Sequence, residues 1–351
     1  MMKSLLLVST RTGAGKTTVG LGLGLRWQNS DYSVGYFKPW GDRIVQDEGV
    51  YDRDAAVFEH HLGLDRERED FSVLYDYQTA LERFRERGDY FRSTVTEQYE
   101  KLRKSKDIML VEGPRNYSFG TYAGLGAADI GSRLDLKAVI VANGDLGVVV
   151  DKVLTCSMIL ERRGVEITGV IVNDNLDREK FENQGRPAIE EEGLDVLGVI
   201  PHHKTISQLT PSLIAEELSA TVLAGKEGLE RPVDNTHVGA MTVSRALTPM
   251  RKSKNSALIT GGDRTDMQLA SFEVSTSCLI LTGGIYPEQI VLSKAEEEGV
   301  PVLLVSEYTY NTARKVETLI PILRPEQSSK VQAVQELIGD WVEIDALAER
   351  L

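Results

Sequence analysis

One stretch near the start of the chain constrains the fold more than any other. Apolar residues 5–8 lead into a turn of small residues, and residues 19–25 then alternate glycine with apolar side chains. A strand, a small-residue turn and a helix in that order form a phosphate-binding loop, because backbone N–H groups and the helix N-terminus point at one anion. We expect Lys16 to meet the β- and γ-phosphates and the Thr17 hydroxyl to hold Mg²⁺. The predicted nucleotide-binding residues of the loop are Thr12, Gly13, Ala14, Gly15, Lys16, Thr17 and Thr18.

The spacing of this loop departs from the commonest consensus. That consensus has glycine five residues before Gly15, where this chain has Thr10, with Ser9 before it. The alternative is an ordinary glycine-rich turn that happens to be followed by a lysine. The strand before the turn and the helix after it favour phosphate binding.

Length and charge limit the classes of protein to consider. A chain of 351 residues predicts two domains, and its 41% hydrophobic residues can build a sizeable core. The net charge of -13 argues against nonspecific binding to nucleic acid or to an anionic membrane. Cys156 and Cys278 lie far apart and fit no metal-binding spacing, and no signal peptide or membrane-spanning run is recognisable. We therefore expect a reduced, cytoplasmic protein.

The first part of the chain alternates β-rich runs with helical stretches. This alternation predicts an α/β fold of the P-loop NTPase type, with a doubly wound parallel sheet. The carboxyl ends of parallel strands meet at one edge, which is where such sheets bind ligands. The six predicted strands bring the following residues to that edge: Ser9, Lys38, Glu112, Asn143, Asn173 and Pro201.

Three charged residues near this edge invite chemical roles. Glu112 is expected to bind Mg²⁺, because a hard cation on phosphates needs oxygen ligands; the alternative is a strand-end carboxylate facing water. Lys38 is expected to neutralise charge on a transferred phosphoryl group or on a carboxylate, or else to be an exposed lysine. Asp54 is a candidate metal ligand and, equally, a candidate helix N-cap.

Five motifs resemble, in order, those of dethiobiotin synthetase and its relatives, which include the cobyrinic acid synthases and the N-terminal domain of long bacterial phosphotransacetylases. The motifs are residues 10–17, 35–39, 54–55, 111–113 and 169–173. The resemblance implies ATP as the nucleotide, Asn173 as the residue that reads adenine, and a homodimer. It also implies Mg²⁺ between Thr17, Asp54 and Glu112, with Lys16 and Lys38 as catalytic groups.

The chain departs from dethiobiotin synthetase at three places. Ser9 stands where that enzyme has glycine, and residues 113–116 read Gly-Pro-Arg-Asn where it has Gly-Ala-Gly-Gly. Those glycines let the diamine substrate approach the backbone, so the substrate is not carried over. Arg11 falls where some dimeric members of the wider class carry a lysine that reaches the partner's nucleotide; the alternative is an exposed loop arginine.

A second domain is expected to begin near Lys204, giving domains 1–204 and 205–325. Residues 258–264 and 280–286 each read as an apolar strand followed by Thr-Gly-Gly, and residues 300–305 supply a third strand. This resembles the DRTGG domain that follows the nucleotide domain in long phosphotransacetylases, which implies regulation. The turns are predicted either to form a small-ligand pocket or simply to need glycine, with Asp263 and Arg264 forming a local ion pair.

Three further features lie around this domain. The tail, residues 326–351, has an apolar stripe at helical spacing, expected to cap the second domain or a dimer partner, with Trp341 as core packing. His202 and His203 suggest a metal pair, but without a third ligand they fit surface residues better. No stretch remains for an acetyl-transferring domain, so phosphate acetyltransferase activity is not expected.

Two functions remain open. The first is a regulatory module in which bound ATP changes the packing of the Thr-Gly-Gly domain and so a partner enzyme. The second is an ATP- and Mg²⁺-dependent enzyme, similar to dethiobiotin synthetase or cobyrinic acid synthase, that activates a small-molecule carboxylate or carbamate. The altered residues after Glu112, beside an intact phosphate loop, favour the first.

Overall fold

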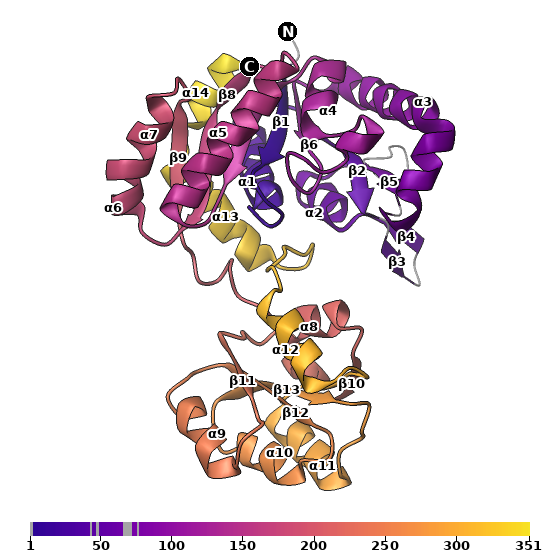
Figure 1. The fold of residues 1–351 in the computed structure, drawn as a ribbon, viewed down its shortest axis with the longest axis vertical. Helices are drawn as coiled ribbons and strands as arrows, with labels where there is room; N and C mark the ends of the chain where they lie inside the picture. The colour runs from indigo at the N-terminus through magenta and orange to yellow at the C-terminus, as the bar shows by residue number, and fades with distance from the viewer. Residues whose placement is uncertain (1–2, 43, 47–48, 66–71, 76) are drawn as a thin grey trace. The chain divides into compact units, whose positions relative to one another are not determined.

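The computed structural model describes residues 3–42, 44–46, 49–65, 72–75 and 77–351 (Figure 1). The chain divides into two compact units. Unit 1 comprises residues 1–206 together with 323–351, and unit 2 comprises residues 207–322. Unit 2 is therefore inserted into unit 1 along the sequence.

The sheet of unit 1 is entirely parallel, in the order β5-β2-β6-β1-β7-β8-β9. The chain passes from β1 to β2 on one side and later returns to place β7 on the other, so the strand order switches at β1, the kind of position where open parallel sheets bind ligands. The predicted fold class and all six predicted strands are confirmed. The bounds are β1 (Lys3–Ser9), β2 (Val34–Asp42), β5 (Ser72–Tyr75), β6 (Ile108–Glu112), β7 (Lys137–Ala142), β8 (Ile167–Asn175) and β9 (Val196–Pro201).

Helices cover both faces of this sheet (Figure 1). A Cβ placed on Gly20 of α1 would lie 2.4 Å from Leu7, and one on Gly131 of α4 would lie 3.2 Å from Leu6. Consecutive strand residues point to opposite faces, so α1 and α4 pack on opposite sides of β1. The helices are α1 (Lys16–Asn29), α2 (Arg53–Leu62), α3 (Tyr77–Leu102), α4 (Ala127–Leu134), α5 (Leu146–Arg162), α6 (Arg178–Lys180) and α7 (Arg186–Glu190).

The charged helix α3 contains a non-helical residue, Arg87, that divides it. Its inner face is buried, because Val95 and Tyr99 belong to the core of unit 1. A short hairpin of β3 (Ile44–Gln46) and β4 (Gly49–Tyr51) precedes α2. In the described part of the chain, no helix is both long enough and apolar enough to cross a bilayer.

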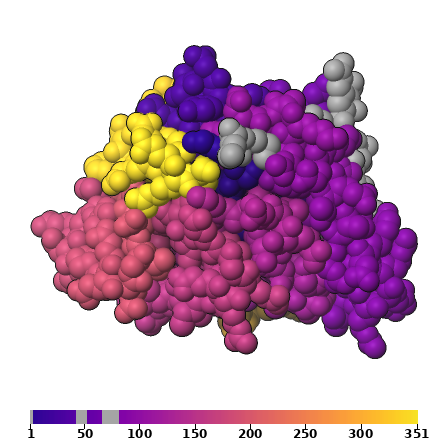
Figure 2. Space-filling view, turned by 90° about the horizontal axis from the view of Figure 1, so that it is seen from above, coloured from indigo at the N-terminus to yellow at the C-terminus, as the bar shows by residue number. Residues whose placement is uncertain are grey.

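The C-terminal tail returns to unit 1, where it forms α13 (Ser328–Trp341) and α14 (Ile344–Arg350). The expectation that it caps the second domain is wrong. Its apolar stripe, including Ile338 and Leu347, is buried in the core of unit 1, and a Cβ on Gly22 of α1 would lie 2.3 Å from Ile338. Figure 2 shows the yellow C-terminal residues beside indigo N-terminal residues of the same unit. Trp341 packs against this core, with the Arg178 guanidinium 4.2 Å from its ring centroid.

Unit 2 has a five-stranded sheet in the order β10-β14-β13-β12-β11, parallel except for the β10–β14 pair. The three predicted strands correspond to β12, β13 and β14. Sequence patterning missed β10 and β11, because edge strands that are short and half exposed carry little apolar periodicity. The elements are α8 (Pro211–Glu217), β10 (Thr221–Ala224), β11 (Asn235–Val238), α9 (Val243–Met250), β12 (Ser256–Gly261), α10 (Thr265–Ser271), β13 (Thr276–Thr282), α11 (Gln289–Glu298), β14 (Val302–Leu304) and α12 (Thr309–Glu317).

Candidate functional site

The predicted phosphate loop joins β1 to α1 at the strand-order switch. Two of its glycines have left-handed backbones, with φ of 75° at Gly13 and 91° at Gly15, a region that favours glycine. The side-chain nitrogen of Asn173 donates a hydrogen bond of 3.1 Å to the carbonyl of Ala14. It lies so close to the loop that a Cβ on Gly15 would be only 2.1 Å from it. The structure therefore brings the predicted adenine-reading residue against the predicted phosphate loop.

The other loop residues divide into buried and accessible ones. Ala14 is buried, Thr12 is exposed, and Thr17 and Thr18 on the first turn of α1 are partly exposed. At the rim, Arg11 is also exposed, and its Nε donates 3.4 Å to the carbonyl of Thr12 in the same loop. This contact agrees with the interpretation of Arg11 as an exposed loop arginine.

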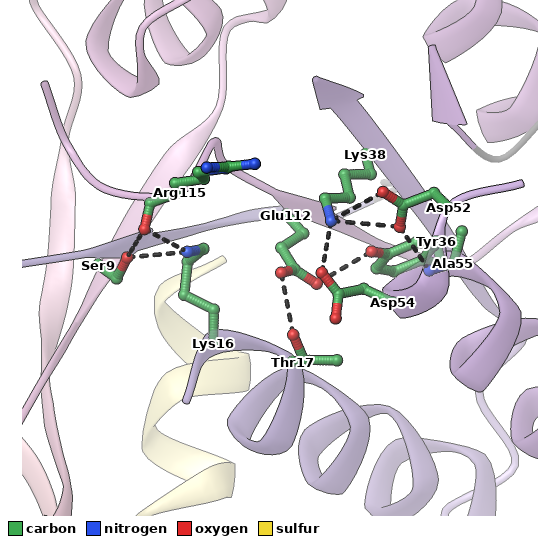
Figure 3. Close-up of polar contacts among 10 residues, drawn as sticks. All are labelled: Ser9, Lys16, Thr17, Tyr36, Lys38, Asp52, Asp54, Ala55, Glu112 and Arg115. Atoms are coloured by element: carbon green, nitrogen blue, oxygen red, sulfur yellow. Dashed lines mark hydrogen bonds and ion pairs between the residues drawn. The ribbon is translucent and has the colours of Figure 1, made fainter. Parts of the chain in front are cut away.

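Lys16 is held between the loop and the segment that follows β6. Its ammonium donates to Ser9 Oγ at 2.8 Å and to the Arg115 carbonyl at 3.2 Å, and Ser9 Oγ donates 3.1 Å to the same carbonyl (Figure 3). The serine that replaces glycine therefore supplies a direct partner for Lys16. Backbone bonds from Gly113 to Leu7 and from Tyr117 to Ser9 fasten the same segment to β1.

Glu112 lies at the centre of the site. The Thr17 hydroxyl donates 3.1 Å to Oε1 and the Tyr36 hydroxyl donates 2.9 Å to Oε2 (Figure 3). Burial, together with the negative charge of Asp54, raises the pKa of Glu112 to about 7, although Lys38 and Lys16 oppose the shift. The interpretation of Glu112 as a carboxylate facing water is therefore wrong, since only 2% of the residue is exposed.

Lys38 is buried and lies between two carboxylates. Its ammonium is 3.0 Å from Asp52 Oδ2, and it also donates to Asp54 (Figure 3). Burial lowers the pKa of Lys38, but the charges of Asp52, Asp54 and Glu112 outweigh burial and hold it well above its ordinary value. The alternative of an exposed strand-end lysine is wrong, because the strand continues to Asp42 and only 6% of Lys38 is exposed.

The aspartates beside Lys38 have different surroundings. Asp52, not Asp54, caps α2, because Asp52 Oδ1 accepts 2.9 Å from the backbone of Ala55. Burial raises the pKa of Asp52 despite the nearby Lys38 ammonium. Burial acts in the same direction on Asp54, yet the Lys38 charge and hydrogen bond lower its pKa overall. The N-cap alternative for Asp54 is therefore replaced by a position in the first turn of α2.

The oxygen atoms of Thr17, Asp54 and Glu112 form the donor set predicted for Mg²⁺. Hydroxyl and carboxylate oxygens are the kind of ligand that a hard cation such as Mg²⁺ takes. Within the described ranges, no group of three or more histidine, cysteine, aspartate or glutamate side chains is arranged as an all-protein metal site.

Sequence reasoning missed two contributors to this cluster, Tyr36 and Asp52, and it placed Ser9 at the edge without predicting its bond to Lys16. Tyr36 precedes Lys38 by two residues in β2, so the period of a strand places both side chains on one face. That spacing was a usable signal. No comparable signal identified Asp52 as the partner of Lys38, because the pairing depends on how α2 packs beside β2.

Two other candidate residues, Asn143 and His202, lie outside this cluster of side chains. Asn143 donates 3.4 Å to the Gly13 carbonyl, beside the loop. His202 pairs with Asp174 at 2.7 Å and is partly solvent-exposed, which agrees with a surface role.

The two Thr-Gly-Gly turns of unit 2 need glycine for different reasons. A Cβ on Gly262 in the first turn would lie 1.8 Å from the Ile285 carbonyl, whereas Gly283 and Gly284 in the second have left-handed backbones, with φ of 82° and 67°. The predicted ion pair between Arg264 and Asp263 is wrong. Arg264 pairs with Asp266 instead, with Nε 3.0 Å from its carboxylate. The glycines of these turns are therefore explained by the fold itself, without any ligand.

Comparisons with known proteins follow the division into units. A model of the AAA domain family matches residues 3–210, and a model of the DRTGG domain matches residues 213–319. The phosphate acetyltransferase of Nitratidesulfovibrio vulgaris is 26% identical over the whole of this chain and 52% of its own length. The chain therefore spans about half the length of the curated relatives it matches end to end.

Two further comparisons concern the first unit. The ATP-dependent dethiobiotin synthetase of Nitrosopumilus maritimus is 28% identical over 59% of this chain and 92% of its own length. The crystal structure of cobyrinic acid a,c-diamide synthase from Mycobacterium smegmatis, with bound ADP and magnesium, covers 58% of this chain and 88% of that chain, at 15% identity and a TM-score of 0.39. The sequence matches confirm the resemblance to dethiobiotin synthetase and to the N-terminal part of phosphate acetyltransferases.

Proposed function

This chain belongs to the AAA domain family, and from that premise we propose that it binds ATP with Mg²⁺ and acts as a nucleotide-dependent regulatory module. Lys16 and the loop backbone would bind the phosphates, and Asn173 would contact adenine. Thr17, Asp54 and Glu112 would hold Mg²⁺, which would neutralise negative charge on the phosphates. The contacts that support this assignment are the Thr17–Glu112 hydrogen bond and the packing of Asn173 on the loop.

One observation carries the regulatory part of the proposal. The Lys16 ammonium, which would bind phosphate, is bonded to the carbonyl of Arg115 in the segment after β6. A phosphate group competes strongly for an ammonium donor, because charge-assisted hydrogen bonds are stronger than neutral ones. Nucleotide binding would therefore weaken the attachment of residues 113–119 to the loop, and their rearrangement would report occupancy to a partner.

The proposed partner is an enzyme, and the proposed assembly is a cytoplasmic homodimer. The relatives matched end to end are named phosphate acetyltransferase, and this chain corresponds to about half of each. Regulation of an enzyme through the DRTGG unit fits a chain that pairs a P-loop domain with that unit. A pull-down from native cytoplasm with the chain loaded with ATP or ADP would identify such an enzyme.

Binding, turnover and hydrogen exchange together test the proposal. A fluorescent ATP analogue should bind saturably and more tightly with Mg²⁺, while ADP release without an acceptor stays at a slow basal rate. The amides of Gly113 and Tyr117, which donate to β1 carbonyls, should exchange faster with the nucleotide bound. Absence of saturable binding would refute the nucleotide assignment, and unchanged exchange would refute the regulatory one.

A second candidate is an ATP-dependent enzyme that activates a carboxylate or carbamate. It is favoured by the buried Lys38, whose ammonium lies beside two carboxylates and could stabilise charge that develops on an acceptor. In that case a screen of small carboxylates, and of amines with bicarbonate, should find one acceptor that accelerates ADP release many-fold. A uniform slow rate across the screen favours the regulatory module.

A further inference from the structure

The two carboxylates that contact Lys38 differ in how firmly they are held. The Asp52 side chain has no exposed surface, and its Oδ1 accepts from the backbone of Ala55 at 2.9 Å. The Asp54 side chain is 31% exposed and lies on the first turn of α2. Asp52 is therefore fixed by burial and by its capping bond, whereas Asp54 is partly open to solvent.

Asp54 faces two competing cations. It accepts a hydrogen bond from the Lys38 ammonium, and it is one of three residues assigned to Mg²⁺ in the proposed function. A carboxylate oxygen that coordinates a metal ion must give up much of its bond to an ammonium. Such an exchange is costly if it leaves a buried charge without its counter-ion.

We propose that Asp52 is a positioning residue that retains the Lys38 ammonium and thereby releases Asp54 to bind Mg²⁺. The ammonium is 3.2 Å from Asp52 Oδ1 and 3.0 Å from Oδ2, so both oxygens already contact it (Figure 3). When Asp54 turns away, Asp52 remains as the counter-ion of Lys38. Lys38 therefore stays at the edge of the site, where it would face the terminal phosphate. The inference rests on the proposed binding of Mg²⁺ with nucleotide.

The test is a comparison of metal affinity among variants that keep the helix cap. Asp52→Asn removes the negative charge, while asparagine caps helices about as well as aspartate. Mn²⁺ binding to the complex with the non-hydrolysable analogue AMPPNP is measured by electron paramagnetic resonance at saturating nucleotide. We expect the affinity for Mn²⁺ to fall roughly tenfold or more, because Lys38 then competes more strongly for Asp54.

Lys38→Met provides the decisive second arm, and it leaves Asp52 in place. Without the ammonium, Asp54 has no competing cation from Lys38, so Mn²⁺ should bind at least as tightly as in the wild type. Adding Asp52→Asn to Lys38→Met should change the affinity by less than about twofold. A large loss in this background would show that Asp52 acts on the metal directly and would overturn the inference.

Two controls separate this inference from folding and from the proposed function. Asp177→Asn removes the same charge from another helix cap, that of α6, and should leave Mn²⁺ affinity unchanged. Asp52→Ser keeps a capping oxygen but is too short to retain Lys38, so it should repeat the loss seen with asparagine. Wild-type protein that binds no Mn²⁺ with AMPPNP refutes the proposed function, whereas wild-type binding with an unchanged Asp52→Asn affinity refutes only the inference.

Discussion

The hydroxyl of Thr17 donates a hydrogen bond of 3.1 Å to Glu112, although 95 residues separate them in the sequence. Thr17 lies on the first turn of α1, and Glu112 is the last residue of β6, the strand beside β1. Parallel pairing of β1 with β6 puts both at the carboxyl edge of the sheet. The register of this one strand pair therefore assembles the centre of the candidate site.

Replacing Glu112 by glutamine should change how stability depends on pH. Burial raises the pKa of Glu112 from 4.5 to about 7 in the folded protein. Between pH 4.5 and pH 7, Glu112 is ionised in the unfolded chain but still protonated in the folded chain. The free energy of unfolding of the wild type therefore falls as pH rises through this range. Below 4.5 and above 7 this contribution is constant. Glutamine cannot titrate, so Glu112→Gln should lack this fall.

Urea unfolding at several pH values, with EDTA and without nucleotide, measures this difference. The free energy of unfolding of the wild type relative to Glu112→Gln should drop by up to about 3 kcal/mol between pH 4.5 and pH 7. Parallel pH profiles for the two proteins would mean that Glu112 is already ionised in the folded state at pH 5.

Lys16→Ala should abolish nucleotide binding and leave the fold intact. Loss of the Lys16–Arg115 bond should loosen residues 113–119 locally, as proposed for bound nucleotide, but the bond of 3.1 Å from Ser9 Oγ to the Arg115 carbonyl and the buried sheet do not involve Lys16 and should hold the fold. Titration with a fluorescent ATP analogue should show at least about a hundredfold loss of affinity, as expected for the loss of a charged phosphate contact. The melting temperature should stay within a few degrees of the wild type. Lys101→Ala, on the exposed side of α3, is the matched control, and unchanged binding in Lys16→Ala would remove Lys16 from the site.

Gly15→Ala should damage the loop, whereas Gly147→Ala should not. A side chain at Gly15 meets both a left-handed backbone and the amide of Asn173 at 2.1 Å, so Asn173 must leave its bond to Ala14. We expect a loss of about 1–3 kcal/mol in stability and of at least tenfold in nucleotide affinity. Gly147 in α5 has no atom near its would-be Cβ, so alanine there should stabilise by up to about 1 kcal/mol. Equal effects of the two changes on binding would contradict the role given to Gly15.

The parallel sheet and its functional edge were predictable because local sequence determines them. Buried strands read as apolar runs, and the residue that ends each run must lie at the shared edge. The loop around Lys16 followed from the same reasoning, even though Ser9 and Thr10 depart from the consensus. The structure adds that the Ser9 hydroxyl is a hydrogen-bonding partner of Lys16, which the glycine of dethiobiotin synthetase at this position does not offer.

Contacts made through tertiary packing were not predictable. The pairing of Lys38 with Asp52 depends on how α2 sits beside β2, and no periodicity encodes that. The destination of the tail was missed for the same reason: an apolar stripe shows that a helix is buried on one side but not what buries it. The signal lay in Gly22 of α1, whose would-be Cβ meets Ile338 of α13, whereas those of Gly20 and Gly24 meet residues of the sheet and of α2.

The packing of the tail on α1 makes a prediction about Gly22 and Ile338. A Cβ on Gly22 would lie 2.3 Å from Ile338 Cγ1, so Gly22→Ala should destabilise unit 1 by about 1–3 kcal/mol, although alanine favours a helix. Ile338→Ala should cost about 2–5 kcal/mol by leaving a cavity at a residue that is 1% exposed. The double variant should lose less free energy of unfolding than the two single variants together, by at least about 0.5 kcal/mol, because the added methyl group occupies part of that cavity. Urea unfolding measures all three, and Gly147→Ala combined with Ile338→Ala should be simply additive. Additivity for Gly22 as well would mean that α13 does not rest on α1 in solution.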